Sequence, residues 1–334
     1  MNLDSLKTRA KLFAPGLAVV CTIGFAALFL SQHYATPVML FSLLLGMALS
    51  FLAEDERSSP GIELASSKIL KVGIAMIGLR LTFGDLQELG LYFLLILLLG
   101  IFSTIGVGIL LSRLFKTSQS FGLVSGAAVG ICGASAALAM SAVLPNTRDR
   151  QQDTSLVVMG VTLLSTIAMI GYPILCTALG MNDQQTGLFL GATIHDVAQV
   201  VGAGYSISNP VGDHATLTKL ARVSLLIPVV ACVVMVVSAR NRKNEGQTSL
   251  PKFPLFLIFF VIFMTINSYI EIPSRLIELS ENVSRFALIM AISAIGMKSG
   301  LRQVFQVGMK PFLILTTETV WLVIYILIAI RLFY

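Results

Sequence analysis

The sequence has few charged residues. Asp, Glu, Lys and Arg make up 12% of the 334 residues, roughly half the share of about 25% that is usual in soluble domains. Hydrophobic residues make up 56%. This composition excludes a disordered chain, because too much apolar surface would have to stay in water. It also argues against a soluble globule, because so few charges could not cover its surface.

Sequence signatures of catalysis and of cofactor binding are missing. The chain has no GxxxxGKS phosphate-binding loop, no HExxH metal motif and no GxSxG nucleophile elbow. Its three histidines are scattered and form no metal-binding cluster. We therefore predict that the protein does not hydrolyse ATP, is not an enzyme, and has no cofactor, no metal site and no catalytic residues.

Cysteine is scarce, and clustered basic residues are absent. The four cysteines lie singly within hydrophobic runs, without CxxC spacing, so they are interpreted as small apolar packing residues. The net charge of +6 does not indicate a nucleic-acid partner, because the basic residues form no stripe with interleaved aromatics.

Long apolar runs are abundant. Residues 12–30, 89–112, 121–147 and 154–182 contain no Asp, Glu, Lys or Arg. About 20 apolar residues in a helix cross the hydrocarbon core of a bilayer. We predict an all-α polytopic membrane protein with about eleven transmembrane helices. The clear spans are 12–30 (a retained first helix), 37–53, 89–112, 121–144, 154–180, 216–239, 253–270 and 311–333, and the weaker ones are 62–82, 186–206 and 282–299.

The basic loops predict the orientation of the chain. Cytoplasmic loops of membrane proteins collect Lys and Arg, and with eleven spans the loop with Arg240, Arg242 and Lys243 falls on the side of the N-terminus. We expect a cytoplasmic N-terminus and an external C-terminus. Residues 77–90 also align without gaps on residues 295–308, in opposite directions across the membrane. Inverted repeats are typical of secondary transporters, and chance similarity of two apolar helix ends is the alternative.

The first candidate site is the small-residue stretch 125–137. Three glycines at this density weaken a helix, since each costs about 1 kcal/mol relative to alanine. A break here would expose backbone N–H groups and the positive end of a half-helix, which can hold an anion. Cys132, Gly133 and Ser135 would line that break. The alternative is close helix packing through small residues.

The second candidate site is the stretch 191–204, where His195 and Asp196 lie about ten residues into a predicted span. Ionisable groups at that depth are costly and mark substrate or proton pathways. On a continuous helix, His195 and Gln199 would share a face and Asp196 would point about 100° away. The alternative is a structural hydrogen-bond cluster between helices.

Further polar residues interrupt other spans. Lys219 and Arg222 are three residues apart near the start of span 216–239, so they project from one face and could bind an anion. Alternatively, they snorkel to the lipid headgroups. Lys71 lies deeper in its span. Glu318 lies within the last span, with Asn267 and Thr317 as candidate polar neighbours, and gives a weaker functional signal.

These motifs resemble a known family. GICGASA (130–136), GATIHDVAQVVGAG (191–204) and TKLARV (218–223), with LKVGIAMIGLRLT (70–82) and Trp321-Leu322, are similar to the YeiH-like bacterial membrane proteins, which are labelled sulfate exporters. The similarity covers residues from about 62 to 334. It implies a fold related to cation/proton antiporters and bile-acid transporters, with two inverted five-helix repeats and broken, crossing helices. Glu318 departs from the family pattern, which puts a general role for it in doubt.

The sequence and the resemblance together predict one transmembrane transporter domain over 1–334. It would comprise an extra N-terminal helix (1–36), a first repeat (37–180) and a second repeat (186–334). We expect a secondary transporter of a small anion (sulfate, another sulfur oxyanion or a sulfonate) in the bacterial inner membrane. Protons or Na⁺ would be the coupling ion, with His195 and Asp196 supplying the protonation step, and a homo-oligomer is left open. A cation/proton antiporter and an intramembrane enzyme are the alternatives. The predicted substrate-binding residues are Cys132, Gly133, Ser135, His195, Asp196, Gln199, Lys219 and Arg222.

Overall fold

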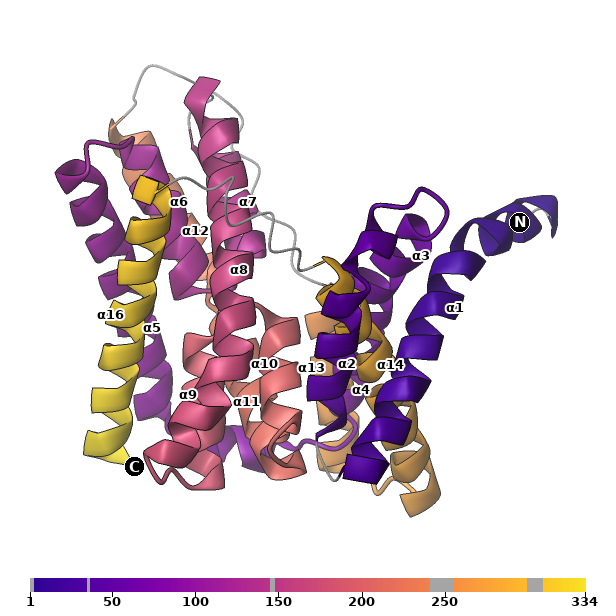
Figure 1. The fold of residues 1–334 in the computed structure, drawn as a ribbon. Helices are drawn as coiled ribbons and strands as arrows, with labels where there is room; N and C mark the ends of the chain where they lie inside the picture. The colour runs from indigo at the N-terminus through magenta and orange to yellow at the C-terminus, as the bar shows by residue number, and fades with distance from the viewer. Residues whose placement is uncertain (1–2, 35–36, 145–147, 241–254, 299–308) are drawn as a thin grey trace. The chain divides into compact units, whose positions relative to one another are not determined.

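The computed structural model describes residues 3–34, 37–144, 148–240, 255–298 and 309–334 (Figure 1). Within these ranges the chain is helical and has no strand, which confirms the predicted all-α class. The helices are α1 (Leu3–Tyr34), α2 (Val38–Ala48), η1 (Ser50–Ala53), α3 (Ser59–Leu64), η2 (Ala65–Ile69), α4 (Leu70–Ile77), α5 (Phe83–Leu114), α6 (Gln119–Gly130), α7 (Ala134–Val143), α8 (Arg148–Ala178), α9 (Asp183–Thr193), α10 (Val197–Tyr205), α11 (Asn209–Ser224), α12 (Leu226–Arg240), α13 (Leu255–Tyr269), α14 (Ser274–Lys298) and α16 (Met309–Phe333).

Five segments of the described chain are long and apolar enough to cross a membrane. They are Leu12–Tyr34, Leu89–Leu114, Gln152–Ala178, Asn209–Val233 and Met309–Phe333. The total of about eleven spans stays a prediction. So does the inverted repeat, because most of its second copy (299–308) lies outside the described residues.

The chain divides into two compact units. The first comprises residues 1–88, 201–213 and 254–300, and the second comprises residues 89–200, 214–253 and 301–334. Helices α5, α10 and α11 each contribute residues to both units.

In the first unit, the core forms where α1, α3, η2 and α14 pack together. Their apolar faces are buried because side chains spaced three and four apart line one side of each helix. The buried members of this cluster are Val20, Ile23, Ile62, Ala65, Met290, Ala294 and Met297.

In the second unit, α5 and α16 run side by side (Figure 1). Helix α5 is kinked at Gly90, which has a φ of 71°. The kink frees the Leu89 carbonyl, which accepts a hydrogen bond of 2.6 Å from the Tyr334 hydroxyl. Further along, the Tyr325 hydroxyl donates to the Ile96 carbonyl at 3.0 Å.

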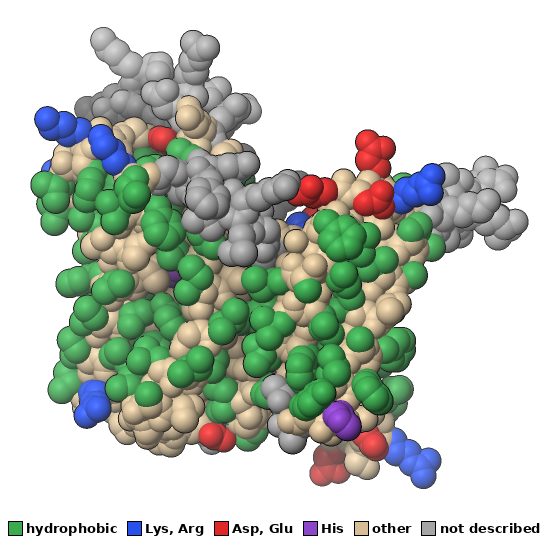
Figure 2. All heavy atoms as spheres, in the orientation of Figure 1, with side chains coloured by type: hydrophobic (Ala, Val, Ile, Leu, Met, Phe, Trp, Pro, Cys, Tyr) green, Lys and Arg blue, Asp and Glu red, His purple; other side chains and the backbone are tan. Residues whose placement is uncertain are grey.

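The flanks of the helices are apolar. Figure 2 shows hydrophobic side chains over these flanks, with charged side chains gathered near the ends of helices. On α5, Leu91, Tyr92, Leu95 and Leu99 are exposed. Large exposed apolar faces are unfavourable in water and are typical of helices that face lipid.

Two predicted spans are each interrupted by three residues that lie outside any helix. Span 121–144 is divided into α6 and α7, at the glycines where we predicted a weak point. Span 186–206 is divided into α9 and α10. The prediction that His195 and Gln199 share a face of one helix is therefore wrong, because His195 and Asp196 lie between the two helices.

Candidate functional site

The first break is fixed by Gly133. Its φ of 62° and ψ of −126° form a backbone conformation that residues with a side chain rarely adopt. Its N–H donates to the Ala128 carbonyl at 2.8 Å, and its carbonyl accepts from the Ala137 N–H at 3.0 Å. The chain can therefore end α6 and start α7 within three residues.

The second break is fixed by polar capping. The Asp196 Oδ1 atom accepts a hydrogen bond of 2.9 Å from the Ala198 N–H, which caps the start of α10. The Asp196 N–H donates to the Ser165 hydroxyl of α8 at 3.0 Å. A Cβ atom placed on Gly133 would lie 3.6 Å from His195 Cβ, so the two breaks are neighbours.

Lys219 joins the two breaks. Its Nζ donates to the Ile131 carbonyl and to the Ile194 carbonyl, each at 2.8 Å. These carbonyls lie at the C-terminal ends of α6 and α9, where the helix dipole is negative. A single buried ammonium therefore stabilises the ends of both half-helices.

Arg222 binds the same helix ends. Its Nε donates to the Gly130 carbonyl at 2.5 Å, its Nη2 to the Val129 carbonyl, and its Nη1 to the Ile194 carbonyl at 3.4 Å. Both cations are buried, with 0% of Lys219 and 1% of Arg222 exposed. They therefore do not snorkel, because the apolar segment begins at Asn209 rather than at 216 and they lie in its interior.

The two cations keep donors for a ligand. A Lys ammonium has three N–H groups and an Arg guanidinium has five. The hydrogen bonds above use two of the former and three of the latter. The remaining N–H groups could bind an anion, so capping the helices and binding a ligand are compatible roles.

His195 is buried beside α16. Its Nε2 lies 3.0 Å from the Thr319 hydroxyl of α16. Nδ1 has no hydrogen bond of normal geometry in the described structure. Because the Thr319 hydroxyl also donates to the Leu315 carbonyl at 2.8 Å, it can accept from an Nε2–H. A neutral ring that carries its proton on Nε2 therefore has an acceptor for that proton.

The other predicted residues are divided between the breaks and the surface. Cys132 is buried at the first break. Gln199 is buried in α10, and its Oε1 has no partner among the described residues. Ser135, in the first turn of α7, is exposed. The structure therefore gathers Cys132, Gly133, His195, Asp196, Lys219 and Arg222 around the two breaks, while Ser135 is exposed.

Glu318 has a different neighbour from those we predicted. Its Oε1 lies 2.7 Å from the Ser125 hydroxyl of α6. Thr317 donates instead to the Leu313 carbonyl, and Asn267 donates to the Leu81 carbonyl in the other unit. The sequence identifies the isolated acid, but the 193 residues between Ser125 and Glu318 hide the pair.

The charges around the breaks add up to a positive centre. Lys219 and Arg222 face the negative ends of α6 and α9, and Asp196 faces the positive end of α10. The positive end of α7 has no capping oxygen from a side chain. Two cations and one anion leave one net positive charge beside a helix N-terminus, an arrangement that favours an anionic ligand.

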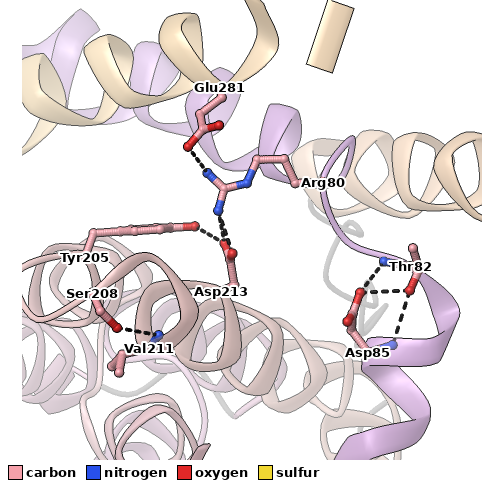
Figure 3. A network of polar contacts seen from close by, with 8 residues as sticks. All are labelled: Arg80, Thr82, Asp85, Tyr205, Ser208, Val211, Asp213 and Glu281. Carbon is pink, nitrogen blue, oxygen red and sulfur yellow. Dashed lines mark hydrogen bonds and ion pairs between the residues drawn. The ribbon is translucent and has the colours of Figure 1, made fainter. Parts of the chain in front are cut away.

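The first unit contains a polar cluster that sequence analysis missed (Figure 3). The Arg80 Nη2 donates to both carboxylate oxygens of Asp213 at 2.6 and 2.5 Å, and its Nη1 donates to Glu281 Oε1 at 3.2 Å. The Tyr205 hydroxyl donates to Asp213 Oδ1 at 2.6 Å. No local signal predicts these contacts, because 133 and 201 residues separate Arg80 from its two acids.

We expect the two acids of this cluster to contribute unequally to stability. Asp213→Asn should lower the free energy of unfolding by about 1.5–3 kcal/mol, because Asp213 accepts from two partners in a partly buried position. Glu281→Gln should cost less than about 1 kcal/mol, since its side chain is 39% exposed. Thermal unfolding of the purified variants measures both. Equal losses would show that the two acids act alike.

A cavity of about 150 Å³ opens beside this cluster. Arg80, Tyr205, Glu281 and Arg285 line part of it. It lies in the first unit, whereas the buried cations lie in the second. Because the Arg80 guanidinium is already held by two carboxylates, we assign the candidate site to the breaks and not to this cavity.

The fold and the site define a polytopic α-helical membrane protein in which two buried cations stabilise two broken helices. Residues 15–315 match the family described as Conserved hypothetical protein 698. The chain belongs to this family, whose relatives are named UPF0324 membrane proteins, and the predicted membership of the YeiH-like family is confirmed.

Similar proteins cover nearly the whole chain. UPF0324 membrane protein CT0845 of Chlorobaculum tepidum is 44% identical over 98% of this chain and 91% of its own length. UPF0324 membrane protein TauZ of Paracoccus denitrificans is 42% identical over 95% of this chain and 94% of its own length. UPF0324 membrane protein RB0971 of Rhizobium meliloti is 42% identical over 97% of this chain and 94% of its own length. No solved structure matches the chain.

Proposed function

We propose that the protein is a secondary transporter of a small anion, a sulfur oxyanion or a sulfonate, in the bacterial inner membrane. The observation that carries this proposal is the positive centre at the two breaks, with its spare N–H groups on Lys219 and Arg222. Discontinuous helices whose ends face a ligand are a common binding arrangement in secondary transporters. The lack of a phosphate-binding loop in the sequence fits transport without ATP hydrolysis.

The burial of the centre supports a role in alternating access. His195, Lys219 and Arg222 are each at most 1% exposed, so an anion held among them would be closed off from solvent. A transporter must pass through such an occluded arrangement before it opens to the other side. We therefore interpret this conformation as occluded.

The name of some relatives supports the choice of substrate class. Relatives from Paracoccus denitrificans and Paracoccus pantotrophus carry the name TauZ, which is taurine-related. Taurine is a sulfonate, and its sulfonate group resembles the inorganic sulfur oxyanions in its S–O groups. Both have oxygen-rich anionic groups that bind the N–H groups of Lys and Arg.

The two alternatives fit the site less well. A cation/proton antiporter would have to bind Na⁺ beside two buried cations, which repel it. An intramembrane enzyme would need a nucleophile activated by His195, and the Thr319 hydroxyl beside this ring donates its proton to the Leu315 carbonyl instead. We therefore propose transport without catalysis, with a cytoplasmic N-terminus and an external C-terminus.

The proposal is tested by ligand stabilisation of the purified protein. A ligand that binds only the folded state at 100 times its Kd stabilises that state by about 2.7 kcal/mol. We expect sulfate, sulfite, thiosulfate or taurine to raise the midpoint of thermal unfolding, and NaCl at matched ionic strength not to do so. Stabilisation by Na⁺ or Li⁺ alone would favour the antiporter and contradict the proposal.

A further inference from the structure

The described structure contains a buried carboxyl group that the proposed anion site does not use. Glu318 in α16 is 0% exposed. Its Oε1 is 2.7 Å from the Ser125 hydroxyl, and its Oε2 has no hydrogen-bond partner among the described residues. No ion pair within the described ranges includes Glu318.

The Glu318 carboxyl group lies in close contact with α5, at Gly108. A Cβ atom on Gly108 of α5 would collide with Glu318 Oε1 and with the Gly122 carbonyl of α6. Glycine at position 108 therefore lets α5 approach α6 while the carboxyl group fits between them. The carboxyl group therefore fills a space that the glycine at position 108 leaves open, and a larger residue there would displace it.

The hydrogen bonds favour the neutral acid. Ionised, this carboxylate would have one donor, the Ser125 hydroxyl, and one oxygen without any donor. Burial of an ionised carboxylate without a cation is far more costly than burial of the neutral acid. As an acid, Glu318 can donate its proton to Ser125, whose hydroxyl then donates to the Gly122 carbonyl at 3.3 Å. In this arrangement the proton of the acid and the hydroxyl proton of Ser125 each have an acceptor.

Glu318 precedes, on the same helix, a residue that contacts the proposed anion centre. The next residue, Thr319, contacts His195 Nε2 at 3.0 Å. The helices packed against α16 bring few other charges: α6 has no titratable side chain. The titratable or charged groups that the other neighbours carry at described positions are Asp85, Tyr92 and Arg113 in α5, Asp153, Tyr172 and Cys176 in α8, and Asp183 in α9.

We propose that Glu318 is a proton-binding site, protonated in this arrangement, and that it takes up and releases the proton that drives anion movement. The second half of this proposal rests on the proposed function. In the occluded arrangement the neutral acid leaves the positive centre free to hold the anion. When the helices open and water reaches the carboxyl group, Glu318 can release its proton to that side.

Infrared spectroscopy of the wild-type protein and of Glu318→Gln tests the proton site without any measurement of transport. Reconstituted wild-type protein at neutral pH should show the carbonyl band of a protonated carboxylic acid, and Glu318→Gln should lack it. Glu278→Gln removes an exposed acid from the other unit and should leave the band unchanged. Ser125→Ala should shift the band while keeping it, because it removes the hydrogen-bond partner and not the acid. An undiminished band in Glu318→Gln would overturn the proton site.

Sulfate uptake into proteoliposomes tests the coupling. Glu318→Gln mimics the neutral acid, so it should keep exchange of internal for external sulfate and lose at least tenfold of the accumulation driven by a pH gradient. Accumulation at the wild-type level in this variant would overturn the coupling role. The two measurements distinguish failure of the proposed function from failure of the proton site. Wild-type protein that moves no sulfate would contradict the proposed function for that anion. The infrared band alone decides whether Glu318 is a proton site.

Discussion

Arg222→Leu is expected to lower the free energy of unfolding by about 3–5 kcal/mol. The change removes three hydrogen bonds and leaves the carbonyls of Val129 and Gly130 buried without that donor. A buried carbonyl that loses its donor costs about 1–3 kcal/mol, so the two carbonyls together account for the expected loss. Thermal unfolding in detergent measures the loss.

Two further variants distinguish charge from geometry at this position. Arg222→Lys keeps the charge but loses the planar fork, so we expect an intermediate loss of stability and a loss of at least tenfold in sulfate affinity. Arg331→Leu makes the same change to leucine at an exposed position in the last turn of α16 and should be nearly silent. Wild-type stability of Arg222→Leu would show that the carbonyls find other partners.

Asp196→Asn is expected to leave the fold intact and to tighten the binding of a divalent anion about tenfold or more. Asn caps helices as well as Asp does, so α10 should keep its start. Removal of the negative charge raises the net charge of the centre by one. At an effective dielectric of about 20, unit charges about 8 Å apart interact by roughly 2 kcal/mol, and about 1.4 kcal/mol corresponds to a factor of ten in Kd.

Isothermal titration with sulfate measures this change, and two controls limit its interpretation. Asp183→Asn changes an exposed acid in the first turn of α9 and should leave the Kd unchanged. His195→Gln keeps a polar group against Thr319 and does not change the net charge of a neutral ring, so its effect on Kd should be smaller. Weaker binding in Asp196→Asn would contradict this expectation. It would show that the carboxylate positions a hydrogen-bond donor that contacts the ligand.

The break between α6 and α7 shows how far local sequence reasoning reaches. Gly130 and Gly133 predict a weak helix because glycine disfavours helices wherever it occurs. The break between α9 and α10 has no such signal, since Ile194, His195 and Asp196 each fit a helix. It forms because the Asp196 carboxylate caps α10 and the Asp196 N–H meets Ser165, which lies 31 residues away.

In the candidate site, too, the sequence predicts some features and the tertiary structure decides others. Lys219, Arg222 and His195 could be selected from the sequence, because ionisable groups in apolar segments are costly and are retained for a reason. The roles of the two cations as caps of α6 and α9 could not be predicted from the sequence, since Arg222 and Gly130 are 92 residues apart. The predicted alternative of snorkelling is wrong, because it assumed a span that starts seven residues too late.

The sequence by itself determined the class of protein: an all-α chain with apolar segments long enough to cross a membrane and a few isolated ionisable groups within them. These properties follow from composition and from the local preferences of the backbone, which act over a few residues. The tertiary structure alone decided the partners of those groups. Glu318 meets Ser125 across 193 residues and Arg80 meets Glu281 across 201, and only helix packing brings such groups within the short range over which hydrogen bonds act.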